Sequence, residues 1–218
     1  MIIVVAQKKG GNSKSCLCTN IAVKLQQDGR KVMLIDTDPQ KTTTDWLLMR
    51  RESEKYPDIR YAFLEGKCNE DLLAFEKDGY DVIVDTAGSD SDTVRWAMLA
   101  GTHILTPVRP KRRDLKVLPQ MKDVLSQTLI NNPNAKVRAV LVQAPTHATQ
   151  KYRINDALDV CEAFEIQPLQ TIQYMRNVYD DSDEAGASVF EYKYGYQKIQ
   201  KAIDEMTNLV EEFIYDKR

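Results

Sequence analysis

The loop that follows the first predicted strand carries residues suited to binding a phosphate group. It reads Lys8-Lys9-Gly10-Gly11-Asn12-Ser13-Lys14-Ser15 and leads from a β-branched run into an amphipathic segment. Glycines let backbone N–H groups curl around an anion, and a helix N-terminus adds partial positive charge. In such a P-loop, Lys14 would reach the terminal phosphates and the Ser15 hydroxyl could bind Mg²⁺. Lys8 and Ser13 stand where the usual pattern G-x-x-x-x-G-K-S/T has glycines, so an ordinary basic, glycine-rich turn is the alternative interpretation.

Acidic residues follow two other predicted strands. The strand 31–35 leads into Asp36-Thr37-Asp38-Pro39-Gln40, and the strand 80–84 leads into Asp85-Thr86-Ala87-Gly88. Mg²⁺ prefers oxygen ligands beside phosphates, and hydrolysis needs a group that positions water. Because the carboxyl ends of parallel strands meet at one edge of a sheet, these residues and the glycine loop together predict a site for Mg²⁺ and a nucleotide.

Strand-like and helix-like segments alternate along the whole sequence. The predicted strands are 1–6, 31–35, 60–64, 80–84, 103–108, 136–142 and 168–174, and the predicted helices are 15–28, 43–54, 69–77, 91–100, 115–129, 150–164 and a terminal amphipathic helix through 199–214. This alternation predicts βαβ units, and therefore an α/β fold with a mostly parallel, twisted sheet and helices on both faces. The strand-end motifs occupy nearly the whole length, so we expect one domain over residues 1–218.

The composition excludes several other classes of protein. The chain has 218 residues, 43% of them hydrophobic, which is enough for a core and excludes a wholly disordered protein. Its 30 Lys and Arg against 32 Asp and Glu exclude a globally basic nucleic-acid coat but not a local basic patch. The sequence contains no apolar run of about 18 residues, so no transmembrane helix is predicted. Four cysteines and two histidines leave little material for a disulfide framework, a zinc site or a Ser-His-Asp triad.

Taken together, the motifs resemble those of the ParA/MinD-type ATPases, which have the deviant Walker A motif K-G-G-x-x-K-S/T. The sequence is most similar to the small ParA plasmid-partition proteins that lack an N-terminal DNA-binding domain. The matching stretches are 9–15, 36–40 with 44–46, and 80–88, while 105–110 and 188–191 match more loosely. The resemblance implies a single-domain P-loop NTPase of the SIMIBI type that binds ATP or ADP with Mg²⁺ and hydrolyses ATP.

The resemblance also implies roles for individual residues. Lys9 would be the signature lysine that crosses a dimer interface to the partner's phosphates, Lys14 the P-loop lysine, and Asp38 the group that orients the attacking water. The implied Mg²⁺ residues are Ser15, Asp36 and Asp85. The implied nucleotide-binding residues are Gly10, Gly11, Asn12, Ser13, Lys14, Ser15 and Cys16 in the loop, with Pro107, Arg109, Pro110, Val189 and Phe190 near the adenine.

The cycle that the resemblance implies joins ATP to DNA binding. ATP would close a sandwich homodimer, the dimer would bind DNA non-specifically, and a ParB-like or centromere-binding partner would stimulate hydrolysis. Such a protein acts in plasmid or chromosome segregation, in the cytoplasm and on the nucleoid. Residues 109–116 carry five positive charges in eight residues and are the first candidate for contacting DNA. Other candidates are Lys151, Arg153, Arg176, Lys193, Lys198 and Lys201, whereas the acidic C-terminal turns argue against binding to a membrane.

Two positions of the loop depart from the family pattern. Ser13 stands where the family has Gly, and Ser15-Cys16 stand where it usually has two Thr. The side chain of Ser13 would crowd the phosphates, so we expect weak nucleotide binding and slow basal hydrolysis. This departure leaves open a degenerate ParA-like protein that acts in plasmid stability or conjugation. A metabolic P-loop ligase on the same scaffold is the other alternative, although Lys9 counts against it.

Overall fold

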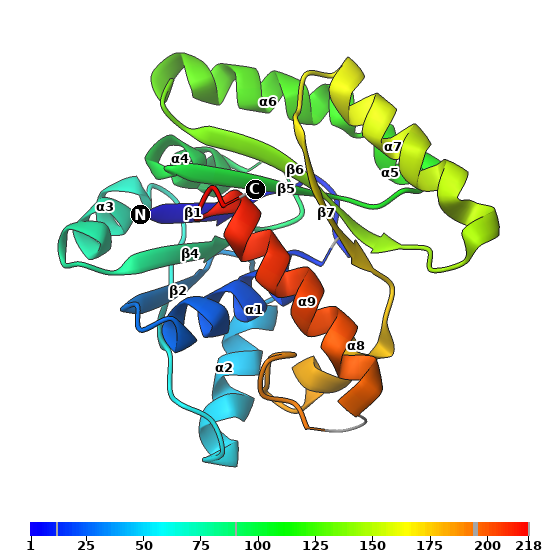
Figure 1. The fold of residues 1–218 in the computed structure, drawn as a ribbon. Helices are drawn as coiled ribbons and strands as arrows, with labels where there is room; N and C mark the ends of the chain where they lie inside the picture. Colours follow the sequence, from blue (N-terminus) through cyan, green and yellow to red (C-terminus); the bar gives the residue numbers. More distant parts are fainter. Residues whose placement is uncertain (12, 90, 194–195, 218) are drawn as a thin grey trace.

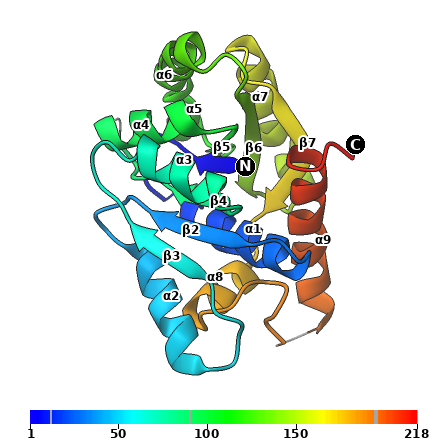
Figure 2. The same cartoon turned by 90° about the vertical axis from the view of Figure 1, so that its left-hand side faces the viewer.

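The computed structural model describes residues 1–11, 13–89, 91–193 and 196–217, and it has an α/β fold (Figure 1). Its seven-stranded sheet has the order β3-β2-β4-β1-β5-β6-β7 (Figure 2). Every adjacent pair of strands is parallel, as the βαβ alternation predicts. The strands are β1 (Ile2–Val5), β2 (Val32–Asp36), β3 (Arg60–Phe63), β4 (Asp81–Asp85), β5 (His103–Val108), β6 (Lys136–Ala144) and β7 (Pro168–Tyr174).

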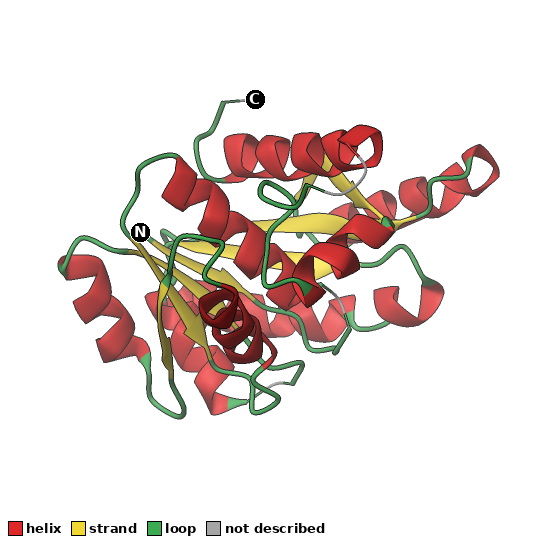
Figure 3. Ribbon diagram, turned by 90° about the horizontal axis from the view of Figure 1, so that it is seen from below, coloured by secondary structure: helices red, strands yellow, loops and turns green. Residues whose placement is uncertain are grey.

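Helices connect the strands and cover both faces of the sheet (Figures 1 and 3). In the described residues they are α1 (Lys14–Gln27), α2 (Thr42–Ser53), α3 (Asn69–Lys77), α4 (Asp92–Ala100), α5 (Arg112–Leu115), α6 (Leu118–Asn131), α7 (Lys151–Ala163), α8 (Asn177–Glu184) and α9 (Tyr196–Phe213), with a short 3-10 helix η1 (Ala148–Gln150). One apolar core lies under α1, α2, α8 and α9, and includes Leu17, Trp46 and Phe213. The other lies under α3, α4, α6 and α7, and includes Leu72, Met98 and Leu125.

The central strands are buried because their sequences are almost wholly apolar. β1 reads IIVV, and each of its residues is buried, as is each residue of β2 and β4. Runs of this kind are typical of parallel strands that are covered on both faces. In the register of the sheet, Asp85 at the end of β4 lies beside both Val5 of β1 and Asp36 of β2. Burial of the apolar runs therefore places two aspartates and the start of the glycine loop at one edge of the sheet.

Two helical segments differ from the sequence-based expectation. The predicted helix 115–129 begins three residues later, as α6 at Leu118, because Pro119 occupies its first turn, and the short helix α5 precedes it. A proline there cannot donate to the carbonyl four residues earlier, and its ring clashes with that carbonyl. The helix α8 was not predicted at all, since its sequence NVYDDSDE is largely acidic and has no apolar stripe.

A buried arginine joins α2 to the segment that follows α8. Arg50 is fully buried and donates to the two carboxylate oxygens of Glu191 at 2.8 and 2.6 Å, and to the carbonyl of Gly186 at 3.2 Å. Trp46, one turn earlier, donates its indole N–H to the carbonyl of Ala187 at 3.1 Å. Gly186 has a φ of +64°, and a Cβ there would lie 2.7 Å from the backbone nitrogen of Arg50. The close packing of these two segments therefore requires glycine at position 186.

Replacement of this glycine tests the contact. We expect Gly186→Ala to lower the free energy of unfolding by about 1–2 kcal/mol for the left-handed backbone and by about 1–3 kcal/mol more because α2 must be displaced. Gly79→Ala is the matched control, because Gly79 also has a positive φ, +83°, but a Cβ there meets no atom within 4 Å. Urea unfolding of both variants gives the two values, and equal losses would contradict the close contact with Arg50.

Candidate functional site

A cavity of about 340 Å³ opens at the carboxyl edge of the sheet, where α1 begins. Its lining combines the predicted glycine loop with the loop after β2 and with α8; it consists of Gly10, Gly11, Ser13, Lys14, Ser15, Cys16, Asp38, Gln40, Thr42, Tyr179, Asp180 and Asp183. Asn12, the remaining predicted loop residue, lies outside the described residues. The first N–H groups of a helix have no partner within the helix, and its dipole is positive at this end. The loop end of the cavity is therefore suited to an anion.

Contacts with the ends of β4 and β5 hold the glycine loop in place. Gln7, which is buried just after the end of β1, donates a side-chain N–H to the carbonyl of Pro107 at 3.1 Å. Gly88, which follows β4, packs so closely that a Cβ on it would lie 2.7 Å from the backbone nitrogen of Gly10. Position 88 therefore requires glycine, because any larger residue would push the glycine loop away from the sheet.

Asp85 lies in the interior of the site, beside the start of α1. Its Oδ2 accepts hydrogen bonds from the hydroxyls of Ser15 and Thr43, both at 2.7 Å. Its Oδ1 is buried and has no hydrogen-bond partner among the described residues. Burial raises the pKa of Asp85 to about 6, although the two hydroxyl bonds partly offset that effect. A buried carboxylate oxygen without a partner, next to a serine hydroxyl, fits the hard oxygen ligands that Mg²⁺ prefers.

The neighbouring aspartate, Asp36, has both of its carboxylate oxygens occupied. Oδ1 accepts from the backbone N–H of Asp38 at 3.0 Å, and Oδ2 accepts from the backbone N–H and the hydroxyl of Thr44, both at 2.8 Å. Asp36 therefore holds the loop after β2 against the first turn of α2. Asp38 itself is half-buried and lines the cavity. Of the two aspartates, the structure gives Asp38 the open position and Asp36 the supporting one.

The two predicted catalytic lysines lie in different surroundings. Lys14 lines the cavity and is only 6% exposed. Lys9 lies outside this lining, because its ammonium group forms an ion pair with the buried Asp114, to which Arg109 also donates at 2.8 Å. Burial alone would raise the pKa of Asp114, but the hydrogen bonds from Lys9 and Arg109 outweigh it and lower the pKa below its usual value. In this structure, Lys9 is thus held by its own chain.

The five residues predicted near the adenine are not part of this cavity's lining. Pro107 and Pro110 are buried, and Arg109 is engaged with Asp114. Val189 is fully buried and donates its backbone N–H to the side chain of Asn20 on α1 at 2.9 Å, and Phe190 beside it is half-buried. The hydrogen bond to Asn20 fastens the backbone at 189 to α1.

The wall opposite the glycine loop comes from α8, which the sequence analysis missed. Tyr179 is buried and donates its hydroxyl to Glu205 of α9 at 2.8 Å, while Asp180 and Asp183 line the cavity. Because carboxylates repel phosphates, this wall is unfavourable for a phosphate group. The acidic run Asp180-Asp181-Ser182-Asp183, which follows the last predicted strand after five residues, was the signal that could have indicated this wall.

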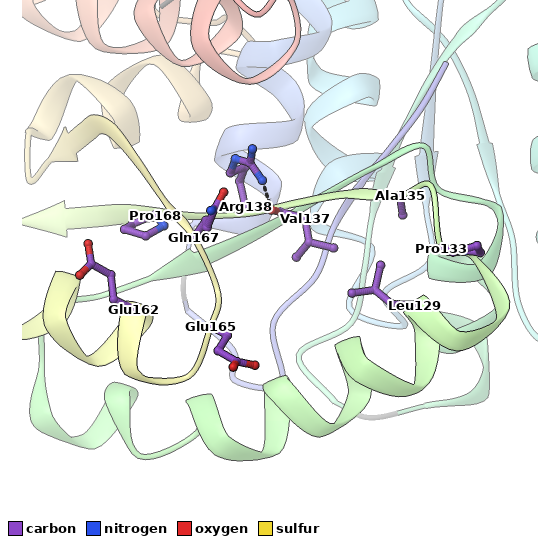
Figure 4. Close-up of a pocket in the computed structure, with 9 residues that line it drawn as sticks. All are labelled: Leu129, Pro133, Ala135, Val137, Arg138, Glu162, Glu165, Gln167 and Pro168. Carbon is purple, nitrogen blue, oxygen red and sulfur yellow. Dashed lines mark hydrogen bonds between the residues drawn. The ribbon is translucent and has the colours of Figure 1, made fainter.

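A larger cavity, of about 770 Å³, lies elsewhere (Figure 4). Its lining comes from the amino-terminal ends of β6 and β7 and the C-terminal ends of α6 and α7, including Arg138, Glu162 and Pro168. Arg138 donates to the carbonyl of the adjacent Val137 at 2.8 Å (Figure 4). No sequence-predicted site residue lines this cavity. Ligands of parallel α/β sheets bind at the carboxyl ends of the strands, so we assign the functional site to the smaller cavity.

The terminal helix α9 belongs to the core of the fold. Its apolar side chains, among them Met206, Val210 and Phe213, are fully buried in the layer that also contains α1. In the part of the chain that the structure describes, no helix combines the length and the apolar character needed to cross a membrane.

Comparison with known proteins matches this chain to a described family. The family of CobQ/CobB/MinD/ParA nucleotide binding domains matches residues 3–211. The "Maintenance of carboxysome distribution protein A" of Halothiobacillus neapolitanus is 26% identical over 213 residues, which is 97% of this chain and 95% of that protein. The chromosome-partitioning ATPase Soj of Thermus thermophilus is 30% identical over 148 residues, 68% of this chain but only 57% of that protein. Its relatives thus include partition and positioning proteins.

The fold itself recurs in a solved structure. A plasmid partition protein of Borrelia burgdorferi bound to AMPPNP superposes with a TM-score of 0.72, over 97% of this chain and 98% of that one. The two sequences are 14% identical, so this likeness concerns the fold. Together with the P-loop geometry, it confirms the predicted fold class.

The carboxylate of Asp183 should make the stability of the protein depend on pH. Burial and the nearby Asp180 and Glu184 raise its pKa from 3.8 to about 6. The folded state therefore holds this proton more tightly than the unfolded chain, and the stability that Asp183 confers when protonated is lost as the pH rises from about 4 to about 6. We expect Asp183→Asn to remove this loss, so that the variant gains stability over the wild type as the pH approaches 7.

Urea unfolding at pH 4, 5, 6 and 7 measures the difference between variant and wild type. Asp181→Asn, on the exposed side of the same helix, is the control and should change stability equally at each pH. A pH-independent difference for Asp183→Asn would contradict the raised pKa.

Proposed function

We propose that this chain, which belongs to the family of CobQ/CobB/MinD/ParA nucleotide binding domains, binds ATP with Mg²⁺ and hydrolyses it. One observation carries this proposal: the N-terminus of α1, the buried Lys14 and the Ser15–Asp85 pair meet at one cavity. The plasmid partition protein with the same fold was solved with AMPPNP, which supports a nucleotide as the ligand of this cavity.

The residues of the loop would divide the work of holding the phosphates. Backbone N–H groups of residues 10–15 would surround the phosphate oxygens, and the Lys14 ammonium would neutralise part of their charge. Ser15 and the open Oδ1 of Asp85 would hold Mg²⁺, Asp85 directly or through water. When bound, Mg²⁺ supplies positive charge where negative charge develops on the phosphate oxygens. Cys16 would lie against the nucleotide at the same end of α1.

Hydrolysis needs a group that orients water, and we propose Asp38, which lines the cavity, for this role. Asp36 fixes the backbone of Asp38 through the bond to its N–H, so the Asp38 carboxylate stays at the wall of the cavity and could accept a hydrogen from the attacking water. The base and ribose would extend toward α8, since Asp180 and Asp183 disfavour phosphates there. In an ATP-bound homodimer, Lys9 would leave Asp114 and reach the partner's phosphates, as the signature lysine of the family implies.

Replacement of Lys14 tests the ATPase proposal. We expect Lys14→Ala to weaken binding of ATP with Mg²⁺ about tenfold to a hundredfold, because hydrogen bonds to charged groups are the strong ones, and to abolish ATP-dependent dimerisation. Lys24→Ala is the matched control, because Lys24 lies on the same helix but pairs with Asp28 at the surface. Calorimetry and light scattering measure the two effects. Wild-type protein that fails to bind ATP, or a Lys14→Ala variant that binds it equally well, would contradict the proposal.

We propose further that the ATP-bound homodimer binds DNA non-specifically and, with a ParB-like or centromere-binding partner, positions a plasmid, a chromosome or another cargo on the nucleoid in the cytoplasm. Within the segment 109–116, the side chains of Lys111, Arg112, Arg113 and Lys116 are exposed, whereas Arg109 is tied to Asp114. Exposed cations without interleaved aromatic rings suit contacts to DNA phosphates, which do not read sequence.

A second basic surface surrounds a pocket of about 240 Å³ at the carboxyl end of β7. Lys151 at the start of α7, Arg176 after β7 and Lys201 of α9 line it together. The chain thus brings together three of the other basic residues considered from the sequence, although they lie up to 50 residues apart in number. The side chain of Lys198 lies outside the described ones. Either basic surface could contact DNA, and paired substitutions separate them.

The two surfaces are distinguished by the salt dependence of DNA binding with ATP present. We expect Arg112→Ala with Arg113→Ala, or else Lys151→Ala with Lys201→Ala, to lower the slope of log affinity against log salt by about 2, one unit for each lost phosphate contact. Lys67→Ala with Lys77→Ala removes the same charge from exposed positions near α3 and should leave the slope unchanged. An unchanged slope for both test pairs would contradict DNA binding at these surfaces.

The alternative function is a nucleotide-independent binding module. The left-handed backbone of Ser13, with φ of 56°, and the capture of Lys9 by Asp114 favour it. Dimerisation that is the same with and without ATP in the light-scattering experiment would select this alternative.

A further inference from the structure

Ser13 occupies a backbone conformation that favours glycine. It precedes the first residue of α1 with φ 56° and ψ 22°, in the left-handed region, and its side chain makes no capping bond to the helix. Side chains with a Cβ adopt this region only against steric resistance. A serine that persists here, in the wall of the cavity, therefore needs a compensating interaction.

That interaction comes from Gln143, which lies near the end of β6. Its Nε2 donates to the hydroxyl oxygen of Ser13 at 2.9 Å and lies 3.4 Å from the carbonyl of Gly11. Its Oε1 faces the guanidinium of Arg109 at 3.5 Å, and Arg109 is itself anchored by Asp114. The donor Arg109 on one side and the acceptors Ser13 and Gly11 on the other set the orientation of the Gln143 amide, so its N–H groups point to the loop.

The orientation of the amide decides what the serine hydroxyl can still do. A hydroxyl has one hydrogen to donate and two lone pairs to accept with. Because Gln143 uses a lone pair of Ser13 Oγ, the hydrogen of that hydroxyl stays available to an acceptor. The phosphate oxygens of a nucleotide are acceptors at neutral pH, and the half-buried Ser13 stands between Gly11 and Lys14 in the wall where they would lie.

We propose that the Ser13 hydroxyl is an additional phosphate ligand of this P-loop, and that Gln143 is the positioning residue that orients it. The inference rests on the proposed function, since it requires that phosphates of a nucleotide occupy the cavity. It reverses the expectation that Ser13 crowds them: the side chain adds a donor to a loop that otherwise offers backbone N–H groups and Lys14.

Calorimetric titration of ATP with Mg²⁺ into Ser13 variants tests the ligand. We expect Ser13→Ala, which keeps the Cβ but removes the hydroxyl, to bind about tenfold more weakly, as for loss of a hydrogen bond to a charged group. Ser13→Gly should also bind more weakly, yet unfold at a higher urea concentration because glycine relieves the left-handed backbone. Crowding would give the opposite for affinity, so Ser13→Gly or Ser13→Ala binding as tightly as wild type, or more tightly, would overturn the proposal.

A double-mutant cycle tests the positioning role. Gln143→Leu keeps the size of the side chain and should weaken ATP binding several-fold in the wild-type background but have no further effect in Ser13→Ala. Equal losses in both backgrounds would show a general structural effect and overturn the role of Gln143. The Lys14→Ala titration separates this result from failure of the proposed function: if wild type binds ATP and Lys14→Ala binds it more weakly, an unchanged Ser13→Ala rejects the serine ligand alone.

Discussion

The buried carboxylate of Asp85 is the constraint on which the arrangement of the site depends. It ends β4, the strand between β1 and β2, and it takes hydroxyl hydrogen bonds from α1 and from α2 at once. A buried carboxylate is destabilising unless donors surround it. The serine after the P-loop lysine and the threonine at the start of α2 therefore serve the fold as well as the site. One oxygen of Asp85 remains without a partner, at the position where a cation would compensate for its burial.

A second polar network lies at the other side of the glycine loop. Asp114 binds Lys9 and Arg109, and Arg109 faces Gln143, which holds Ser13. Through these side chains the ends of β5 and β6 determine the position of two loop residues. The same network withdraws Arg109 from the basic segment 109–116 and holds Lys9 of the glycine loop. The positive residues of this segment thus differ: Arg109 is paired with Asp114, whereas the cations of α5 and its flanks are exposed.

The helix α2 connects the loop after β2 with the segment 186–191. Its first turn is held by Asp36, and its middle is fastened to residues 186–191 by Arg50 and Trp46. The loop with Asp38, the helix α2 and the segment after α8 thus form one continuous set of contacts. A buried, bidentate pair such as Arg50–Glu191 is intolerant of losing one partner, because the other charge would be left without compensation. Rigid support of this kind suits the water-orienting role proposed for Asp38.

The sequence by itself determined the elements and the edge of the sheet at which they meet. Apolar runs predicted each strand, and helix periodicity predicted most helices, because both patterns are local. Glycines, lysines and aspartates after those strands indicated the loop and the two strand-end acids, which the structure places around one cavity or directly beside it. The exceptions had weak local signals: the acidic sequence of α8 has no apolar stripe, and Pro119 makes α6 begin later than periodicity alone predicts.

Only the tertiary structure decided which side chains meet. Lys9 and Asp114 are 105 positions apart, and Ser13 and Gln143 are 130 apart. Such pairs depend on the order of β1, β5 and β6 and on the register between them, which no local pattern encodes. For the same reason, the sequence alone did not show that α8 lines the cavity. The residue types that suit the loop to its chemistry are consecutive in the sequence, whereas its geometry depends on neighbours that only the folded sheet brings together.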